Sequence, residues 1–366
     1  MLWANMLPPR NARHYMIAVM QASALRRLPV WPGEPPRPGP RVLAPDAPAP
    51  RSVRVSLTDR CDLACVYCRP SRQEHYLESR LDDDAWRAIL DGLERAGVRR
   101  VRFTGGEPLL HRSLDEMIAY AAGLGFEDIA LTTNATRLAH RARALRSAGL
   151  HRITISLDSL DAIRFARITR GGDLAGVLAG IDAAVAARFD EVKINCVVLR
   201  GENDHELADI VRFAWARGIV PRFLEVMPVG EGARLVPDRL VTVREMRDAL
   251  GDLIEGAADA VPDPDRGPAR YVGAAADPRL RVGFISGTSD TFCAGCDRLR
   301  VAADGVVRPC LAKDDGASAR VPAEAGDAPA IAGVIEEAWR LKPDGLVWKG
   351  CTEATARGVS MRAVGG

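Results

Sequence analysis

The chain lacks a hydrophobic run long enough to cross a membrane, and it lacks an excess of either charge. A membrane-spanning helix needs about 20 consecutive, mostly apolar residues, so we expect no membrane partner. The 50 basic and 48 acidic residues give a formal net charge of +2 over 366 residues. A chain this balanced is not a general polyelectrolyte binder, which argues against nucleic acid as a partner. An anionic ligand must therefore be bound by a few placed arginines.

The sequence also lacks the GxxxxGKS/T phosphate loop, so an ordinary nucleoside triphosphatase is not expected. Residues 1–50 lack acidic side chains before Glu34 and hold 11 of the 24 prolines. This composition predicts a disordered extension, or a start assigned upstream of the true one. The alternative is a transit or export signal, because arginines flank a short apolar piece there.

Eight cysteines are present, and six of them form two tight sets. A chain of this length does not need disulfides for stability, so the clustering favours metal binding and a reducing, cytoplasmic compartment. Cys61, Cys65 and Cys68 have the spacing CxxxCxxC. Three thiolates can hold three irons of a 4Fe–4S cluster and leave the fourth iron open, whereas clusters held by protein alone normally use four cysteines. A structural zinc site is the alternative, but it needs four ligands and only His75 follows nearby.

The second set is Cys293, Cys296 and Cys310. It again offers three ligands and no obvious fourth, and zinc completed by the distant Cys351 is the alternative interpretation. Two sets of three cysteines make two open-iron 4Fe–4S clusters the simpler hypothesis. A second open iron could bind a substrate atom directly.

Strand-like and helix-like segments alternate through the first half of the chain, which predicts parallel βα units. Most of these strands keep one polar face, whereas a closed barrel fills its lumen with apolar side chains. We therefore expect an α/β fold: an incomplete (β/α)6 TIM-type barrel with a polar lumen, and a C-terminal α+β extension carrying the second cluster. The predicted strands are 53–58, 98–104, 128–133, 152–158, 191–199 and 220–227, and the predicted helices are 81–96, 112–123, 138–148, 175–187 and 206–217.

The composition changes after residue 228, where glycine and proline become frequent and 241–250 is the clearest helix. We predict three parts: the extension 1–50, a partial barrel over 51–230, and a C-terminal substrate-binding part over 231–366. Ligands of such barrels gather at the carboxyl ends of the strands. The first cysteine loop and the Gly105-Gly106-Glu107 turn both fall there.

Paired arginines are the strongest candidates for binding an anion. Arg298 and Arg300 follow the second cysteine pair and point the same way if the segment is extended. Arg100 and Arg102 repeat this spacing on the second predicted strand. Guanidinium groups suit phosphate oxygens, and several would be needed for a triphosphate. Glu107 could accept a hydrogen bond from a ligand ammonium.

These motifs resemble the radical S-adenosylmethionine superfamily and, within it, the GTP 3',8-cyclase family of molybdenum cofactor biosynthesis. The resemblance covers about residues 51–366. It is carried by RVSLTDRC at 54–61, RVRFTGGEP at 100–108, TTN at 132–134, SLDS at 156–159, VKIN at 192–195, RFLEVM at 222–227, FCAGCDRLR at 292–300, Cys310-Leu311 and the terminal Gly365-Gly366. Departures from the family pattern are Ala135 in place of glycine, Ala312 in place of phenylalanine, and an unusual loop at 313–319.

The resemblance implies a lyase that converts GTP to (8S)-3',8-cyclo-7,8-dihydroguanosine 5'-triphosphate. The first cluster would bind and cleave S-adenosylmethionine, and the resulting radical would take the 3' hydrogen of GTP. The second cluster would hold the guanine. The implied cofactor contacts are Tyr67, Gly106, Glu107, Thr133, Ser156, Lys193 and Met227. The implied GTP contacts are Arg54, Arg100, Arg102, Arg222, Arg298 and Arg300. Arg298, Arg300, Gly365 and Gly366 are the implied catalytic residues.

The same resemblance implies a homodimer, a flavodoxin- or ferredoxin-type electron donor, and a downstream cyclic pyranopterin monophosphate synthase. Two other functions stay open at this point. One is a radical S-adenosylmethionine enzyme that modifies peptides with an auxiliary cluster, against which the arginines and the Gly-Gly tail argue. The other is a non-enzymatic zinc-binding scaffold or RNA-binding module.

Overall fold

A computed structural model describes residues 50, 52–73, 75–256, 267–277, 279–290, 292–293, 296–312, 315–342 and 361. All of them belong to one unit, Pro40–Gly366. The predicted N-terminal extension, Cys351 and the terminal Gly365 and Gly366 lie outside the described residues. No helix in the described part of the chain is long and apolar enough to span a membrane.

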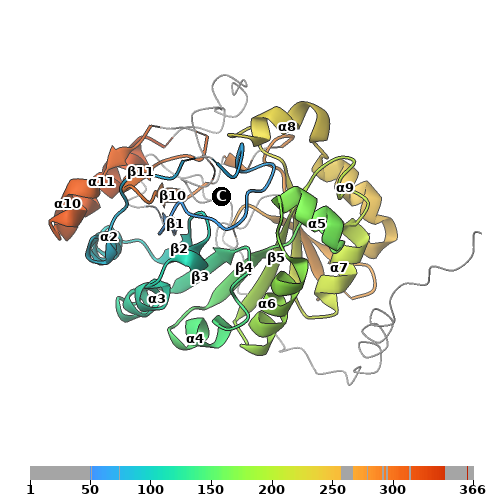
Figure 1. The fold of residues 1–366 in the computed structure, drawn as a ribbon, viewed down its shortest axis with the longest axis horizontal. Helices are drawn as coiled ribbons and strands as arrows, with labels where there is room; N and C mark the ends of the chain where they lie inside the picture. The colour runs from blue at the N-terminus through green and yellow to red at the C-terminus, as the bar shows by residue number, and fades with distance from the viewer. Residues whose placement is uncertain are drawn as a thin grey trace, which may run out of the picture. The chain divides into compact units, whose positions relative to one another are not determined.

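A single twelve-stranded sheet organises the fold, in the order β12-β11-β10-β1-β2-β3-β4-β5-β6-β9-β8-β7. Figure 1 labels β11, β10 and the strands β1 to β5 of this sheet. Every neighbouring pair from β10 through β9 is parallel, and the strands beyond them are antiparallel. The strands of the predicted barrel are β1 (Ser52–Ser56), β2 (Arg100–Thr104), β3 (Asp128–Thr133), β4 (Arg152–Ser156), β5 (Glu191–Val198) and β6 (Val220–Glu225). The predicted α/β architecture with six successive parallel strands is confirmed.

The C-terminal segment adds strands to both edges of this same sheet. It contributes β9 (Arg281–Ile285) beside β6 and β10 (Arg298–Val301) beside β1. The outer strands are β7 (Ile254–Glu255), β8 (Arg270–Ala274), β11 (Val306–Arg308) and β12 (Ala317–Ser318). The extension is therefore present, and it brings Arg298 and Arg300 next to the first strand of the barrel.

Helices cover the outer face of the sheet (Figure 1). They are α2 (Asp83–Arg95), α3 (Leu114–Gly123), α4 (Ala142–Ser147), α5 (Ala162–Thr169), α6 (Leu174–Ala186), α7 (Leu207–Trp215), α8 (Gly232–Arg239), α9 (Val243–Leu250), α10 (Arg320–Glu324) and α11 (Ala328–Arg340), with 3-10 turns at Pro108–Leu110 and Gly251–Leu253. In α2 the side chain of Asp82 accepts a hydrogen bond from the Ala85 amide, which caps the helix. Its Gly92 lies against Ile331 of α11, where a Cβ atom would approach the isoleucine side chain to 2.3 Å.

Strand alternation separates the apolar core from the polar lumen. Val53 and Val55 of β1 are fully buried under the helices, while Arg54 lies on the opposite face, because successive strand side chains alternate. Cys196 of β5 is also fully buried, in a second core cluster where the Phe223 and Phe284 rings lie 6.3 Å apart. The core thus fills the space between sheet and helices and leaves the inner face to polar side chains.

Within residues 51–250 the prediction differs from the structure at three helices, and beyond residue 250, where no helix was predicted, α10 and α11 were missed as well. The predicted helix 138–148 begins only at Ala142, because Ala135 has a φ of 62° and the chain turns before the helix starts. Helix α5 was not predicted, although Asp161 caps it and Phe165 is buried. Helix α8 was also missed, since its Pro237 and the glycines around it suggested a loop.

Candidate functional site

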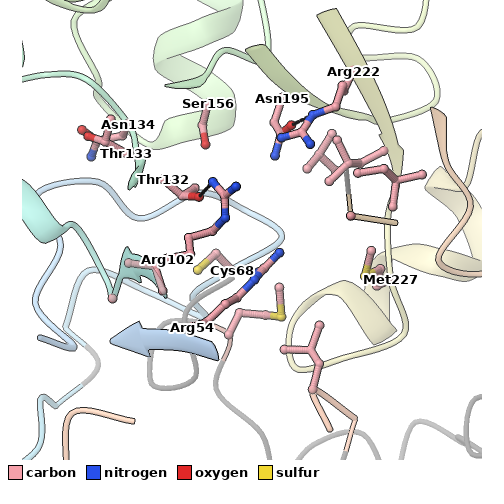
Figure 2. Close-up of a pocket in the computed structure, with 18 of the residues that line it drawn as sticks. Arg54, Cys68, Arg102, Thr132, Thr133, Asn134, Ser156, Asn195, Arg222 and Met227 are labelled. Atoms are coloured by element: carbon pink, nitrogen blue, oxygen red, sulfur yellow. Dashed lines mark hydrogen bonds between the residues drawn. The ribbon is translucent and has the colours of Figure 1, made fainter. Parts of the chain in front are cut away.

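A cavity of about 260 Å³ opens at the carboxyl ends of the parallel strands, next to the first cysteine loop (Figure 2). Most of the predicted site residues line it. They are Arg54, Cys61, Cys65, Tyr67, Cys68, Arg100, Arg102, Gly106, Glu107, Thr133, Ser156, Arg222, Met227, Arg298 and Arg300. Lys193, Cys293, Cys296 and Cys310 are not among the lining residues, and Gly365 and Gly366 lie outside the described residues.

The first cysteine loop is held against the end of α5. The amide of Ala64 donates to the Thr169 carbonyl at 3.2 Å, and the amide of Val66 donates to the Ile168 carbonyl at 2.9 Å. All three cysteines are half-buried. Burial raises the pKa of the Cys61 thiol, and the Glu107 carboxylate raises it further. A cationic group among these sulfurs would offset both effects, because it favours the thiolate.

Asp62 anchors this loop to the turn that follows β3. Its carboxylate accepts from the Asn134 side-chain amide at 2.8 Å and from the Thr136 hydroxyl at 2.7 Å. The same amide lies 3.9 Å from the Cys61 sulfur. Sequence reasoning assigned no role to Asp62 or Thr136. The sequence signal that could have found this contact is the Thr-Thr-Asn motif at 132–134, because its Asn134 donates to Asp62.

The Gly105-Gly106 turn packs directly on the cysteine loop. A Cβ atom on Gly106 would lie 2.3 Å from the Arg60 carbonyl oxygen, and one on Gly105 equally close to the Thr58 carbonyl oxygen. The Gly106 and Glu107 amides donate to those two oxygens, at 2.6 Å from Thr58 and 2.7 Å from Arg60. The glycines are therefore required by close backbone approach.

Glu107 is buried and its carboxylate accepts from groups of the protein. One oxygen accepts from the Thr133 hydroxyl at 2.6 Å and from the Leu109 amide at 2.9 Å, and the other accepts from the Asn134 amide at 2.7 Å. Burial raises the pKa of Glu107 to about 7, although these hydrogen bonds oppose the shift. The carboxylate therefore ties the turn after β2 to the turn after β3.

Tyr67 reaches from the cysteine loop to the end of β4. Its hydroxyl donates to Asp158 at 2.7 Å, and the other oxygen of that carboxylate accepts from the Val197 amide at 2.9 Å. Burial raises the pKa of Asp158 to about 6. This contact fixes the ring of Tyr67 on the cavity wall.

Arginines from separate strands gather in the lumen (Figure 2). The register places Arg54 opposite Arg300 on one side and Arg102 on the other. Burial lowers the pKa of Arg54, and the charges of Arg300, Arg298, Arg102 and Arg222 lower it further, in that order. Burial followed by the charge of Arg298 likewise lowers the pKa of Arg300 to about 10. Because these positive charges repel one another, the cavity favours binding of an anion.

Other charged groups of the lumen are neutralised by carboxylates. Arg100 pairs with Asp297 at 3.1 Å. Lys193 pairs with Glu191 at 2.6 Å and lies 5.8 Å from the centre of the Tyr271 ring. Burial and then the charge of Arg222 lower the pKa of Lys193 to about 7. In this structure the Lys193 side chain is therefore bound by the carboxylate of Glu191.

The second cysteine set lies next to Arg298. Cys293 and Cys310 pack in a small apolar cluster with Val229 and Leu311. The Arg298 guanidinium lies 3.4 Å from the Cys296 sulfur. Burial opposes ionisation of Cys296, but the charges of Arg298 and Lys342 outweigh it and lower the pKa to about 6.

No three His, Cys, Asp or Glu side chains among the described residues are grouped to hold a single metal ion. A 4Fe–4S cluster makes a different demand, because each thiolate binds a different iron of the cube. Cys61, Cys65 and Cys68 all line one wall of the cavity. The chemistry and placement of these donors therefore fit a cube-type cluster.

A parallel βα sheet with a three-cysteine loop after its first strand, opening on a cavity at the strand ends, defines a radical S-adenosylmethionine enzyme. The Radical SAM superfamily matches residues 55–214, and Molybdenum Cofactor Synthesis C matches residues 219–348.

Similar sequences indicate which family of radical S-adenosylmethionine enzymes the chain belongs to. A GTP 3',8-cyclase from Pelotomaculum thermopropionicum is 39% identical over 298 residues, which are 80% of this chain and 91% of the relative. A second, from Pseudomonas putida, is 39% identical over 301 residues, which are 80% of this chain and 88% of that relative. A third, from Erythrobacter litoralis, is 38% identical over 320 residues, which are 84% of this chain and 94% of that relative. The chain belongs to the GTP 3',8-cyclase family.

Solved structures support the fold. Streptococcus suis SuiB bound to the precursor peptide SuiA superposes with a TM-score of 0.59 at 16% identity, over 83% of this chain and 66% of SuiB. SuiB bound to S-adenosylmethionine gives a TM-score of 0.56 at 15% identity, over 85% of this chain and 68% of SuiB. At this identity the likeness concerns the fold alone.

Proposed function

We propose that this chain is a GTP 3',8-cyclase that forms (8S)-3',8-cyclo-7,8-dihydroguanosine 5'-triphosphate in the first step of molybdenum cofactor biosynthesis. One observation carries the proposal: arginines from β1, β2, β6 and β10 converge on the cavity that the first cysteine loop borders. Several buried, mutually repelling guanidinium groups suit a triphosphate. The identity to cyclases over most of the chain supports the same assignment.

Cys61, Cys65 and Cys68 would hold a 4Fe–4S cluster with S-adenosylmethionine beside it. When bound, this pair supplies the 5'-deoxyadenosyl radical that takes the 3' hydrogen of GTP. Tyr67, Gly106, Thr133, Ser156 and Met227 line the adjoining wall, which supports their proposed contacts with the cofactor. The proposed cofactor roles of Glu107 and Lys193 have less support, because protein groups already engage both side chains.

A second cluster on Cys293, Cys296 and Cys310 is also part of the proposal. The position of Cys296 beside Arg298 supports it, since a guanine held there would lie near the phosphate-binding arginines. Arg298 and Arg300 would orient the nucleotide, and Gly365 and Gly366 would reach the site from the C-terminus. The division into residues 51–230 and 231–366 stays a prediction.

The remaining partners are proposed from the resemblance to the cyclase family. Reductive cleavage needs an electron donor of the flavodoxin or ferredoxin type, and the cyclised product needs a synthase that consumes it. Oxygen-sensitive clusters favour the cytoplasm. We also propose a homodimer.

The test is product analysis of the anaerobically reconstituted chain with GTP, S-adenosylmethionine and dithionite. We expect one 5'-deoxyadenosine and one cyclised nucleotide per turnover, and transfer of deuterium from 3'-deuterated GTP to 5'-deoxyadenosine. Reactions without S-adenosylmethionine or with guanosine in place of GTP are the controls. Formation of 5'-deoxyadenosine without deuterium and without cyclised nucleotide would exclude this function.

A further inference from the structure

Arg102 and Arg222 share one hydrogen-bond acceptor, the hydroxyl of Thr154. The Nη1 atom of Arg102 lies 3.3 Å from the Thr154 oxygen, and the Nη2 atom of Arg222 lies 3.2 Å from it. Thr154 is 2% exposed and stands on β4, which lies midway between β2 and β6 in the sheet. One buried hydroxyl therefore joins two guanidinium groups whose strands are not neighbours.

The other side-chain acceptors of these two arginines are also uncharged. Arg102 donates to the Thr132 hydroxyl at 3.3 Å, and Arg222 donates through Nε to the Asn195 carbonyl oxygen at 2.8 Å (Figure 2). By contrast, Arg100 is paired with the carboxylate of Asp297. Hydroxyl and amide oxygens fix the position of a guanidinium without cancelling its charge. These hydrogen bonds therefore leave the positive charge of the pair for a ligand, although the carboxylates of Asp128 and Glu191 act on Arg102 without pairing directly with it.

Each of the two guanidinium groups also keeps a donor for that ligand. Within the described residues, the Nη2 atom of Arg102 and the Nη1 atom of Arg222 donate to no protein acceptor. Both arginines line the cavity, whereas Thr154 does not. Thr154 thus lies behind the guanidinium groups and acts on a ligand only through them. Burial, followed by the charges of Arg152 and Arg222, lowers the pKa of Arg102 to about 10, as expected for like charges held close together.

We propose that Thr154 is a positioning residue that sets Arg102 and Arg222 as one clamp for adjacent phosphate oxygens. The identity of the anion as the triphosphate of GTP rests on the proposed function. The clamp itself requires only a polyphosphate, because guanidinium groups match phosphoryl oxygens whatever the nucleoside.

The test compares three substitutions in the reconstituted full chain. Thr154→Val keeps the shape and removes the acceptor, and Thr154→Ser keeps the hydroxyl. Thr154→Asp keeps an acceptor but offsets one of the two positive charges. The probes are inorganic tripolyphosphate, GTP and guanosine, with dissociation constants measured anaerobically by calorimetry. We expect Thr154→Val to bind tripolyphosphate and GTP about 10-fold more weakly and guanosine unchanged. Thr154→Ser should restore wild-type affinity, and Thr154→Asp should bind tripolyphosphate more weakly than Thr154→Val.

Turnover provides a second readout. In Thr154→Val the KM for GTP should rise while kcat at saturating GTP is unchanged, since Thr154 touches no reacting atom. Unchanged tripolyphosphate affinity in Thr154→Val would overturn the clamp, and so would an equal loss of guanosine affinity, which indicates a structural defect. A wild-type chain that binds tripolyphosphate through this clamp but forms no cyclised nucleotide would refute the proposed function and leave the clamp standing.

Discussion

Arg100 of β2 and Asp297, the residue before β10, form a buried ion pair with a nitrogen-to-oxygen distance of 3.1 Å. Their side chains are only 13% and 11% exposed. The pair joins the first half of the barrel to the C-terminal strand that carries Arg298 and Arg300. It therefore helps to hold the two halves of the cavity wall in register.

We expect Asp297→Asn to destabilise the fold by about 2 kcal/mol, because it leaves the buried Arg100 charge without its carboxylate. The free energy of unfolding in urea measures this loss. The matched control is Glu127→Gln, which breaks the exposed pair between Arg99 and Glu127 and should change stability by less than about 0.5 kcal/mol. Equal effects of the two substitutions would show that the buried pair does not stabilise the sheet.

Cys65→Ala should abolish cleavage of S-adenosylmethionine, since the first cluster would lose one of its three protein ligands. The measurement is 5'-deoxyadenosine formation after anaerobic reconstitution, together with iron content. Cys196→Ala is the control, because that cysteine is buried in the core and lies outside the cavity lining. Persistent 5'-deoxyadenosine in Cys65→Ala would mean that the cluster is held elsewhere.

Cys310→Ala should separate the two halves of the reaction. Cleavage of S-adenosylmethionine should continue, because Cys61, Cys65 and Cys68 are intact, while cyclised nucleotide should be lost. The iron content per chain should fall by about half, since a 4Fe–4S cluster with three protein thiolates is left with two. A variant that still cyclises GTP at the wild-type rate would contradict the proposed role of the second cysteine set.

The strands and the face of each side chain were predictable from the sequence, because alternation along a strand is local. Arg54, Arg102 and Arg222 were expected in the lumen and are found there. The sequence could not predict that β9 and β10 join opposite sides of the six-stranded parallel sheet. These short strands are defined by their pairing with β6 and β1, and β1 in particular lies far from β10 in the chain.

Partners within the lumen were also beyond sequence reasoning. The pattern placed Lys193 and Asn195 on one face of β5, but only the structure shows that Glu191 binds the lysine while Asn195 binds Arg222. Likewise, the sequence marked Ala135 as a departure from glycine. The structure shows why glycine would suit the position, since the residue has a φ of 62°.

Lys193 gives a prediction for the pH dependence of stability. Burial, then the charge of Arg222, lowers its pKa to about 7 in the folded chain, although Glu191 opposes the shift. In the unfolded chain a lysine has a pKa of about 10.4. Between these values the unfolded chain holds a proton that the folded chain has released, so the stability contributed by this group rises with pH across that range. It is lost progressively as pH falls from about 10.4 to about 7, and below 7 both states hold the proton and the contribution no longer changes.

Unfolding in urea at pH 7, 8 and 9 tests this in the wild type and in Lys193→Met. The substitution removes the titrating group and keeps an apolar stem beside the Tyr271 ring. Groups that titrate in both proteins cancel in the difference between their unfolding free energies. That difference should rise in favour of the wild type with pH, with a limiting slope of about 1.4 kcal/mol per pH unit. A difference that stays flat or falls would show that Lys193 remains charged in the folded chain, held by Glu191.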